Sequence, residues 1–245
     1  MTFEDTSSCA SLRDNSQQMT HSIGVRSPHG LAELAATWGR SAPFAPALLA
    51  PGRPTLDYGQ LLSLLRRIGA ALACAGVGYE DRVAIILPNG PEMAVAALAT
   101  SAYAACAPLN PAYGEDELRF YLGDLRPRAL ILAESHSGPA RAVAAEFGIP
   151  CLDARWSETE PAGSFELRGL HRSTPAAAPS RGDDEVALVL HTSGTTSRPK
   201  IVPLTQRNIC RSAANIASSL RLTPEDRCLN VMPLFHIHGL AAAVL

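Results

Sequence analysis

From residue 31 onward, the sequence alternates between short apolar runs and longer segments whose apolar residues recur at helical spacing. The clearest run, residues 82–87, is rich in aliphatic and β-branched side chains and is stopped by Pro88-Asn89-Gly90, as expected for a strand buried on both faces. Strands and helices that alternate at this pitch are joined by right-handed crossovers, which produce a parallel sheet. The sequence therefore predicts an α/β fold with largely parallel sheets and flanking helices.

The same patterns locate the individual elements. We expect helices at residues 31–38, 61–72, 92–103, 115–122, 139–147 and 205–220. We expect strands at residues 82–87, 106–109, 128–133, 149–152, 185–190 and 227–232. Residues 153–184 contain several prolines and glycines and interrupt this rhythm, so they are expected to form a long surface connection with a short strand near residues 165–167.

The composition is that of an ordinary folded protein, since 47% of the 245 residues are hydrophobic, 18% are charged and the formal net charge is −2. This excludes a chain that is disordered throughout, a collagen-like fibre and a strongly basic nucleic-acid-binding protein. Residues 1–27 lack the apolar core of a secretory signal and are expected to be a disordered tail. The longest uncharged stretch, residues 93–114, contains Pro108 and Pro111, so it is interpreted as a buried helix and a strand rather than a transmembrane segment.

The six cysteines are far apart in the sequence, with no two closer than 18 residues and no C-x-x-C pair. Such spacing is not typical of a structural zinc site or a dithiol redox motif. It favours reduced thiols in a reducing compartment, and we therefore expect a cytoplasmic protein.

Lys200 is the only lysine among the 21 lysine and arginine residues. A GC-rich genome explains the preference for arginine. Lys200 also closes a distinctive segment, in which a buried strand at residues 185–190 leads into a loop with five hydroxyl residues between Thr192 and Ser197. Backbone N–H groups and hydroxyls that converge with an ammonium form an anion-binding site suited to a polyphosphate.

Two other interpretations of this loop have to be compared with an anion-binding site. A P-loop of the G-x-x-x-x-G-K-[ST] type does not fit, because Pro199 precedes the lysine and Ile201 follows it. A solvated turn rich in serine and threonine is the ordinary explanation of such a cluster.

Four motifs make the phosphate-binding interpretation the stronger one, because in their order along the chain they resemble those of the adenylate-forming (AMP-binding) superfamily. They are residues 81–92 around Pro88-Asn89-Gly90, residues 108–113, the segment Thr192-Ser193-Gly194-Thr195-Thr196 with Pro199-Lys200, and residues 232–239. The superfamily includes acyl-CoA synthetases, luciferases and peptide-synthetase adenylation domains. The form of the loop looks most like that of the oxalate–CoA ligase branch. Ser197 and Ile201 depart from the family, which usually has glycine at both positions.

The resemblance implies an ATP-dependent acid–CoA ligase that forms an acyl-adenylate and then an acyl-CoA thioester, with ATP, Mg²⁺ and coenzyme A as cofactors. It assigns Lys200 and His236 as catalytic residues and Thr196 also as a metal ligand. The implied ATP-binding residues are Thr192, Ser193, Gly194, Thr195, Thr196 and Lys200.

His236 matches the family histidine that borders the carboxylate pocket. Without the family, a histidine beside Phe235 is more often a packed or capping residue. His236 and His238 form an H-x-H pair, but no third zinc ligand lies nearby in the sequence.

The resemblance covers residues 28–245, and family members are about twice as long, so we expect the N-terminal part of an adenylation domain without its C-terminal lid domain. The substrate would be a small carboxylic acid, with oxalate suggested by the loop and a fatty acid as the alternative. Two other functions stay open: a truncated, non-catalytic nucleotide- or partner-binding protein, and an adenylation enzyme with an acceptor other than coenzyme A.

Overall fold

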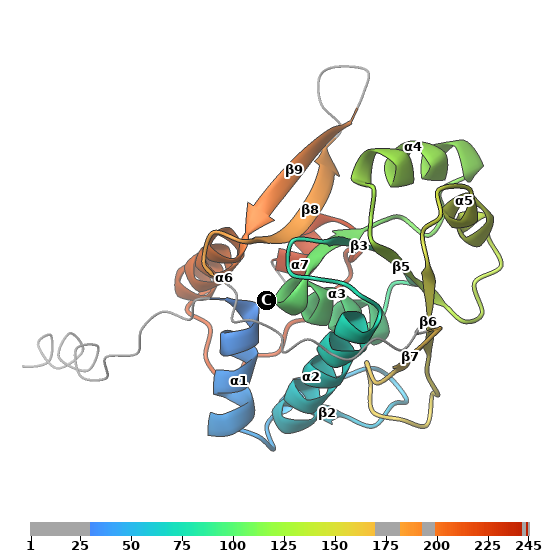
Figure 1. Cartoon of the computed structure of the whole chain (residues 1–245). Helices are drawn as coiled ribbons and strands as arrows, with labels where there is room; N and C mark the ends of the chain where they lie inside the picture. Colours follow the sequence, from blue (N-terminus) through green and yellow to red (C-terminus); the bar gives the residue numbers. More distant parts are fainter. Residues whose placement is uncertain (1–29, 170–181, 193–198, 242–243, 245) are drawn as a thin grey trace, which may run out of the picture.

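The computed structural model describes residues 30–169, 182–192, 199–241 and 244 (Figure 1). Its helices are α1 (Leu31–Ser41), α2 (Tyr58–Cys74), α3 (Pro91–Tyr103), α4 (Glu115–Leu125), α5 (Ala140–Glu146), α6 (Gln206–Leu220) and α7 (Ile237–Ala241). Its strands are β1 (Pro46–Leu48), β2 (Leu56–Asp57), β3 (Arg82–Ile86), β4 (Ala105–Pro108), β5 (Ala129–Ala133), β6 (Cys151–Arg155), β7 (Glu166–Arg168), β8 (Val186–Thr192) and β9 (Lys200–Thr205).

Seven strands form one sheet in the order β7-β6-β5-β3-β4-β8-β9. The five inner strands are parallel to one another, whereas β7 and β9 pair antiparallel at the two edges. Strands β1 and β2 form a separate antiparallel pair. This arrangement confirms the predicted α/β class.

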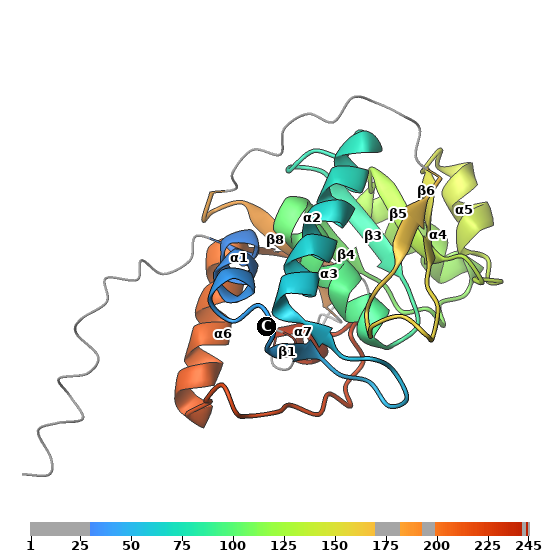
Figure 2. The same ribbon diagram turned by 90° about the horizontal axis from the view of Figure 1, so that it is seen from below.

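Helices cover both faces of the sheet (Figures 1 and 2). On one face, apolar residues of α1, α2 and α3 pack against alternate residues of the central strands, such as Val83 and Ile85. On the other face, α4 and α5 pack against the intervening residues Ala84 and Ile86. All four of these β3 side chains are completely or almost completely buried, which explains why the strand is a continuous apolar run.

Local sequence signals define the ends of several helices. At the start of α2, Asp57 accepts a hydrogen bond of 2.7 Å from the Gln60 backbone N–H, and the Gln60 side chain accepts one from the Asp57 N–H. After α2, Gly76 has a φ of 74°, a left-handed conformation in which glycine avoids the steric penalty of a side chain. At α6, Thr205 and Asn208 form the equivalent capping box. The predicted helices therefore form close to their expected bounds.

One predicted strand is wrong. Residues 227–232 form no strand in the described part of the chain, and Leu229 and Val231 are 86% and 76% exposed. Their apolar sequence resembles a strand, but a strand also needs a neighbour to receive its backbone hydrogen bonds. The described structure places no such neighbour beside this segment.

Other differences concern short elements. The strand predicted at residues 149–152 begins later, as β6, because Pro150 has no N–H to donate and pairing with β5 starts at Cys151. The predicted surface connection at residues 153–184 is wrong at its start, since β6 continues to Arg155. The short strand expected near residues 165–167 forms as β7, directly after the buried Phe165. The sequence patterns did not reveal β1, β2, β9 or α7.

The described helices include none that combines the length and the apolar character needed to cross a membrane.

Candidate functional site

The β8–β9 hairpin brings Thr192 and Lys200 together. The two strands pair antiparallel from Val186 opposite Thr205 to a last pair formed by Thr192 and Lys200. Both residues are exposed at this end of the hairpin. Ser193, Gly194, Thr195 and Thr196, the other residues assigned to ATP and Mg²⁺, lie outside the described residues. The hairpin thus joins the two ends of the predicted phosphate loop.

This end of the hairpin lies at the carboxyl edge of the parallel strands. β3, β4 and β8 are neighbours in the sheet and run in the same direction. These strands end at Ile86, Pro108 and Thr192, so their carboxyl ends lie at the same edge of the sheet. Ligands of open α/β sheets bind at this edge, where loops and helix N-termini converge. Residues of three of the four sequence motifs therefore lie together at the carboxyl ends of the parallel strands.

The fourth motif, residues 232–239, is attached to the first. The side-chain Oδ1 of Asn89 accepts a hydrogen bond of 2.8 Å from the Leu234 backbone N–H, and the Leu234 side chain is buried. Asn230 stabilises the same segment. Its side-chain amide accepts a hydrogen bond from the Met232 N–H and donates one to the Gly239 carbonyl. The loop after β3 therefore positions the segment that carries His236.

His236 lies in a tight turn rather than in the core. Its backbone N–H donates to the Pro233 carbonyl over 3.2 Å, its ring lies 4.6 Å from that of Phe235, and the residue is exposed. A Cβ atom at Gly239 would lie only 2.4 Å from the Pro233 oxygen, so this close approach requires glycine. Within the described residues, no hydrogen bond or ring contact joins His236 directly to Thr192 or Lys200.

A buried ion pair supports this edge of the sheet and was not found from the sequence. Arg53 and Glu92 lie 3.1 Å apart, and their side chains are 5% and 9% exposed. Glu92 also accepts from the Gly163 N–H, while Arg53 donates to the carbonyls of Glu160 and Pro161. The pair therefore ties the start of α3 to two distant loops. Glu92 was visible as part of a motif, but no local pattern distinguishes Arg53.

A second unforeseen cluster lies beside the hairpin. His191 Nε2 is 3.0 Å from Asp124 Oδ2, and the His191 ring packs edge-on against Tyr121 with 4.7 Å between ring centroids. Tyr121 in turn stacks on Tyr113 at 4.6 Å. Burial, together with a hydrogen bond to Tyr121, raises the pKa of Tyr113 far above its usual value, so this phenol stays neutral.

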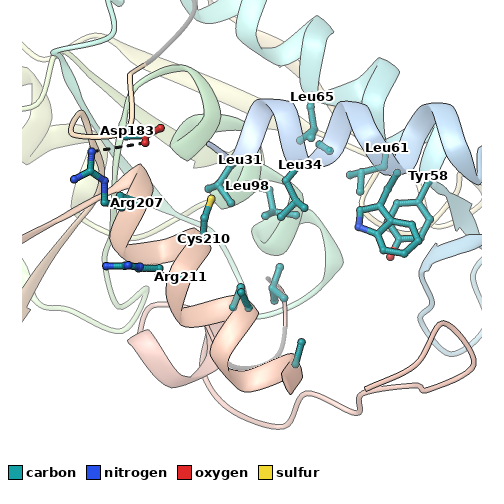
Figure 3. A pocket seen from close by; sticks show the side chains of 16 residues that line it. Leu31, Leu34, Tyr58, Leu61, Leu65, Leu98, Asp183, Arg207, Cys210 and Arg211 are labelled. Atoms are coloured by element: carbon teal, nitrogen blue, oxygen red, sulfur yellow. Dashed lines mark ion pairs between the residues drawn. The ribbon is translucent and has the colours of Figure 1, made fainter. Parts of the chain in front are cut away.

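A cavity of about 880 Å³ lies between α1, α2 and α6 (Figure 3). Apolar side chains line most of it, among them several leucines, Trp38 and Tyr58, and the ion pair between Arg207 and Asp183 lies at one end. α6 begins where β9 ends, at the opposite end of that strand from Lys200. Of the predicted site residues that the structure describes, Thr192, Lys200 and His236, none lines this cavity.

The described residues include no group of three or more His, Cys, Asp and Glu side chains that could hold a metal ion. Thr196, the predicted metal ligand, is outside the described residues.

Known proteins resemble this chain in sequence. The family model described as AMP-binding enzyme matches residues 35–245. An oxalate–CoA ligase from Arabidopsis thaliana is 38% identical over 205 residues, and one from Saccharomyces cerevisiae is 40% identical over 190 residues. These matches cover 81% and 68% of this chain but only 39% and 35% of the two relatives.

Solved structures also resemble this fold. The ATP-bound structure of MatB from Rhodopseudomonas palustris has a TM-score of 0.70 and 28% sequence identity, and the match covers 87% of this chain and 42% of that chain. The chain thus spans about two fifths of the length of the relatives that it matches.

Proposed function

Because this chain belongs to the AMP-binding enzyme family, we propose that it is the ATP-binding part of an acid–CoA ligase. A carboxylate oxygen of the substrate attacks the α-phosphorus of ATP, and the bond to pyrophosphate breaks. The thiol sulfur of coenzyme A then attacks the acyl carbon, loses its proton and releases AMP. The observation that carries this proposal is the pairing of Thr192 with Lys200 at the carboxyl edge of the parallel sheet.

Lys200 is proposed to bind the phosphates that become pyrophosphate. Negative charge accumulates on this group as the bond to the α-phosphorus breaks, and a positioned ammonium stabilises it. Thr192, Ser193, Gly194, Thr195 and Thr196 would add hydroxyl and backbone donors. A compact ammonium on a flexible stem can follow the departing phosphates better than a planar guanidinium, so this site favours lysine in a chain that otherwise uses arginine.

Mg²⁺ fits this site without a preformed protein cage. The ion keeps several waters and is commonly held by substrate phosphates and one or two protein oxygens. The hydroxyl of Thr196 would supply such an oxygen, and the ion would neutralise phosphate charge.

His236 is proposed to border the pocket of the carboxylic acid. A hydrogen bond from the Leu234 N–H to Asn89 attaches its turn to the β3–α3 loop, which supports a place near the carboxyl ends of the parallel strands. The substrate class that we favour is a small dicarboxylic acid such as oxalate, because the loop sequence resembles that branch and two relatives carry that name. A longer fatty acid is the alternative. The wide spacing of the six cysteines favours reduced thiols and hence a cytoplasmic location.

The proposed domain assignment gives residues 28–245 to the first part of an adenylation domain and residues 1–27 to a tail. Since the chain spans about two fifths of its relatives, we propose that it does not complete the ligase reaction alone. Adenine binding, ribose binding and thioester formation would then depend on further residues.

The experiment is acid-dependent exchange of radiolabelled pyrophosphate into ATP, measured on the 245-residue chain and on the product of the complete open reading frame that contains it. We expect exchange with the complete product and oxalate, followed by CoA-thioester formation, and none with the 245-residue chain. Absence of exchange across short and long acids, with ATP still bound, would instead establish a non-catalytic nucleotide-binding protein. Exchange without thioester formation would indicate a different acceptor, such as a carrier protein.

A further inference from the structure

The outer half of the β8–β9 hairpin extends beyond the support of the central sheet. Among the described residues, β8 joins β4 through a single pair, Cys106 opposite Leu188. From Val189 to Thr192, the described backbone pairing of β8 is with β9 alone, and β9 is an edge strand. Thr192 and Lys200 form the last pair of this two-stranded extension, so something other than the sheet must fix their position.

His191 supplies a connection from this extension to α4. Its side chain is only 7% exposed, which is low for a residue one position from the end of a hairpin. Nε2 lies 3.0 Å from the Asp124 carboxylate, and the ring packs against Tyr121, both on α4. The contact therefore combines a hydrogen bond with aromatic packing on the same helix.

α4 is itself firmly held. Leu118, Leu122 and Leu125 are buried against the sheet. Arg119 bonds to Glu146 of α5, and the Arg82 side chain donates to the Leu125 carbonyl at the helix end. A side chain anchored to α4 is thus anchored to the packed layer on this face of the sheet.

Ile201 completes the contact from the other strand. It lies directly opposite His191 in the hairpin and packs on the apolar cluster that also includes Tyr113 and Tyr121. Because neighbouring residues in a strand point to opposite faces, Thr192 and Lys200 face away from this anchor. One face of the hairpin end is therefore used for attachment, which leaves the other face available to a ligand.

We propose that His191 is a positioning residue, which holds Thr192 and Lys200 in place for ATP through its contacts with Asp124 and Tyr121, with Ile201 as the second point of attachment. The expected effect on ATP kinetics rests on the proposed function. The attachment of the hairpin to α4 is independent of it. Ile201 occupies a position where the resemblance leads one to expect glycine, and its side chain gives the hairpin an apolar contact that glycine lacks.

The test uses His191→Phe, which keeps an aromatic ring on Tyr121 but removes the hydrogen bond, and Asp124→Ala, which removes the acceptor. Asp116→Ala is the matched control, because Asp116 lies on the same helix with a fully exposed side chain. The double variant His191→Phe/Asp124→Ala shows whether the two residues act as one unit. Ile201→Ala tests the second point of attachment.

The first measurement is amide hydrogen exchange at residues 189–192 and 200–202, which requires no activity. We expect exchange about tenfold faster in both single variants, no further increase in the double variant, and control values for Asp116→Ala. Unchanged exchange in both single variants, with an unchanged melting temperature, would overturn the attachment.

The second measurement is kcat/KM for ATP in pyrophosphate exchange with the complete reading-frame product. We expect a fall of about tenfold for His191→Phe and for Asp124→Ala, with an unchanged KM for the acid and restoration by Asp124→Asn. Altered hydrogen exchange with wild-type ATP kinetics would overturn the positioning role. Failure of the unmodified protein to catalyse exchange would refute the proposed function, while the first measurement would still decide the attachment.

Discussion

The Oδ1 atom of Asn89 accepts a hydrogen bond of 2.8 Å from the backbone N–H of Leu234, which is 145 positions further along the chain. The bond joins the turn after β3 to the segment that carries His236. A side-chain amide is well suited to this role, since it presents an acceptor to a backbone donor that has no strand partner.

Asn89→Ala should therefore displace the His236 turn. Loss of one such hydrogen bond destabilises a protein by about 1 kcal/mol, so the variant should still fold. We expect a KM for the carboxylic acid about five- to tenfold higher, with little change in the KM for ATP, because the phosphate loop is held separately. Steady-state pyrophosphate exchange on the complete reading-frame product measures both constants.

Asn89→Asp serves as the conservative variant, because a carboxylate keeps the acceptor for the Leu234 N–H. Asn215→Ala on the exposed side of α6 is the control for loss of a surface amide. Equal KM values for the acid in Asn89→Ala and the unmodified protein would show that the bond does not position the site.

Lys200→Ala should slow adenylation strongly. Removal of one preorganised contact to the developing charge typically raises a barrier by about 3 kcal/mol, which corresponds to a rate lower by a factor on the order of 100. Lys200→Arg keeps the charge but replaces a flexible ammonium with a planar guanidinium, so we expect an intermediate rate. Single-turnover formation of acyl-adenylate measures the step directly.

Arg168→Ala, which removes an exposed cation of β7, is the control for a change in net charge. A wild-type adenylation rate in Lys200→Ala would remove the proposed role of the lysine, whatever its effect on ATP affinity.

Much of the fold could be predicted because its information is local. The apolar run at residues 82–87 and the helical spacing of apolar residues at 61–72 each depend only on their own neighbourhood, and the structure confirms a strand and a helix there. β9 was missed for the opposite reason. Pro203 lies inside it, and the strand exists because it pairs with β8 along an edge where a missing N–H is tolerated.

In the candidate site, too, some features follow from local sequence and others only from long-range contacts. The motif around Lys200 predicts which residues bind phosphate, and the hairpin register places Thr192 opposite Lys200. The contacts of His191 with Asp124 and of Arg53 with Glu92 join residues 67 and 39 positions apart, respectively, and no periodicity encodes them. Residues 227–232 have a strand-like sequence but no strand beside them, so local preference alone gave the wrong result.

The buried pair of Arg53 and Glu92 should be important for stability. Removing one partner of such a pair leaves the other charge buried without compensation, which typically costs 3–5 kcal/mol. Because Arg53 retains Glu158 at 3.0 Å and two backbone carbonyls, we expect Glu92→Ala to lower the free energy of unfolding by about 3 kcal/mol. Urea denaturation followed by circular dichroism measures the change.

Glu158→Ala provides a control on the same arginine, because the Glu158 side chain is 78% exposed and its ion pair is screened by water. Its effect should be within about 0.5 kcal/mol of zero. Equal destabilisation by the two substitutions would contradict the assigned difference between the buried and the exposed partner.

Cys106 should remain unreactive in the folded protein. It lies in β4 at the centre of the sheet, and burial raises the pKa of its thiol to about 12. Since the thiolate is the reactive form, alkylation by iodoacetamide at pH 8.5 should modify the exposed Cys228 and spare Cys106 until the protein is unfolded in urea. Mass spectrometry of the labelled peptides distinguishes the two sites.

The same burial makes stability depend on pH in a defined direction. The folded-state pKa lies above the ordinary value of 9.0, so below pH 9 the thiol is protonated in both the folded and the unfolded chain. As the pH rises from about 9 toward 12, the unfolded chain loses this proton while the folded chain retains it, which favours unfolding. Cys106→Ala should remove this part of the alkaline decline in the free energy of unfolding. An identical decline in the variant, or rapid native labelling of Cys106, would show that the thiol is accessible to water.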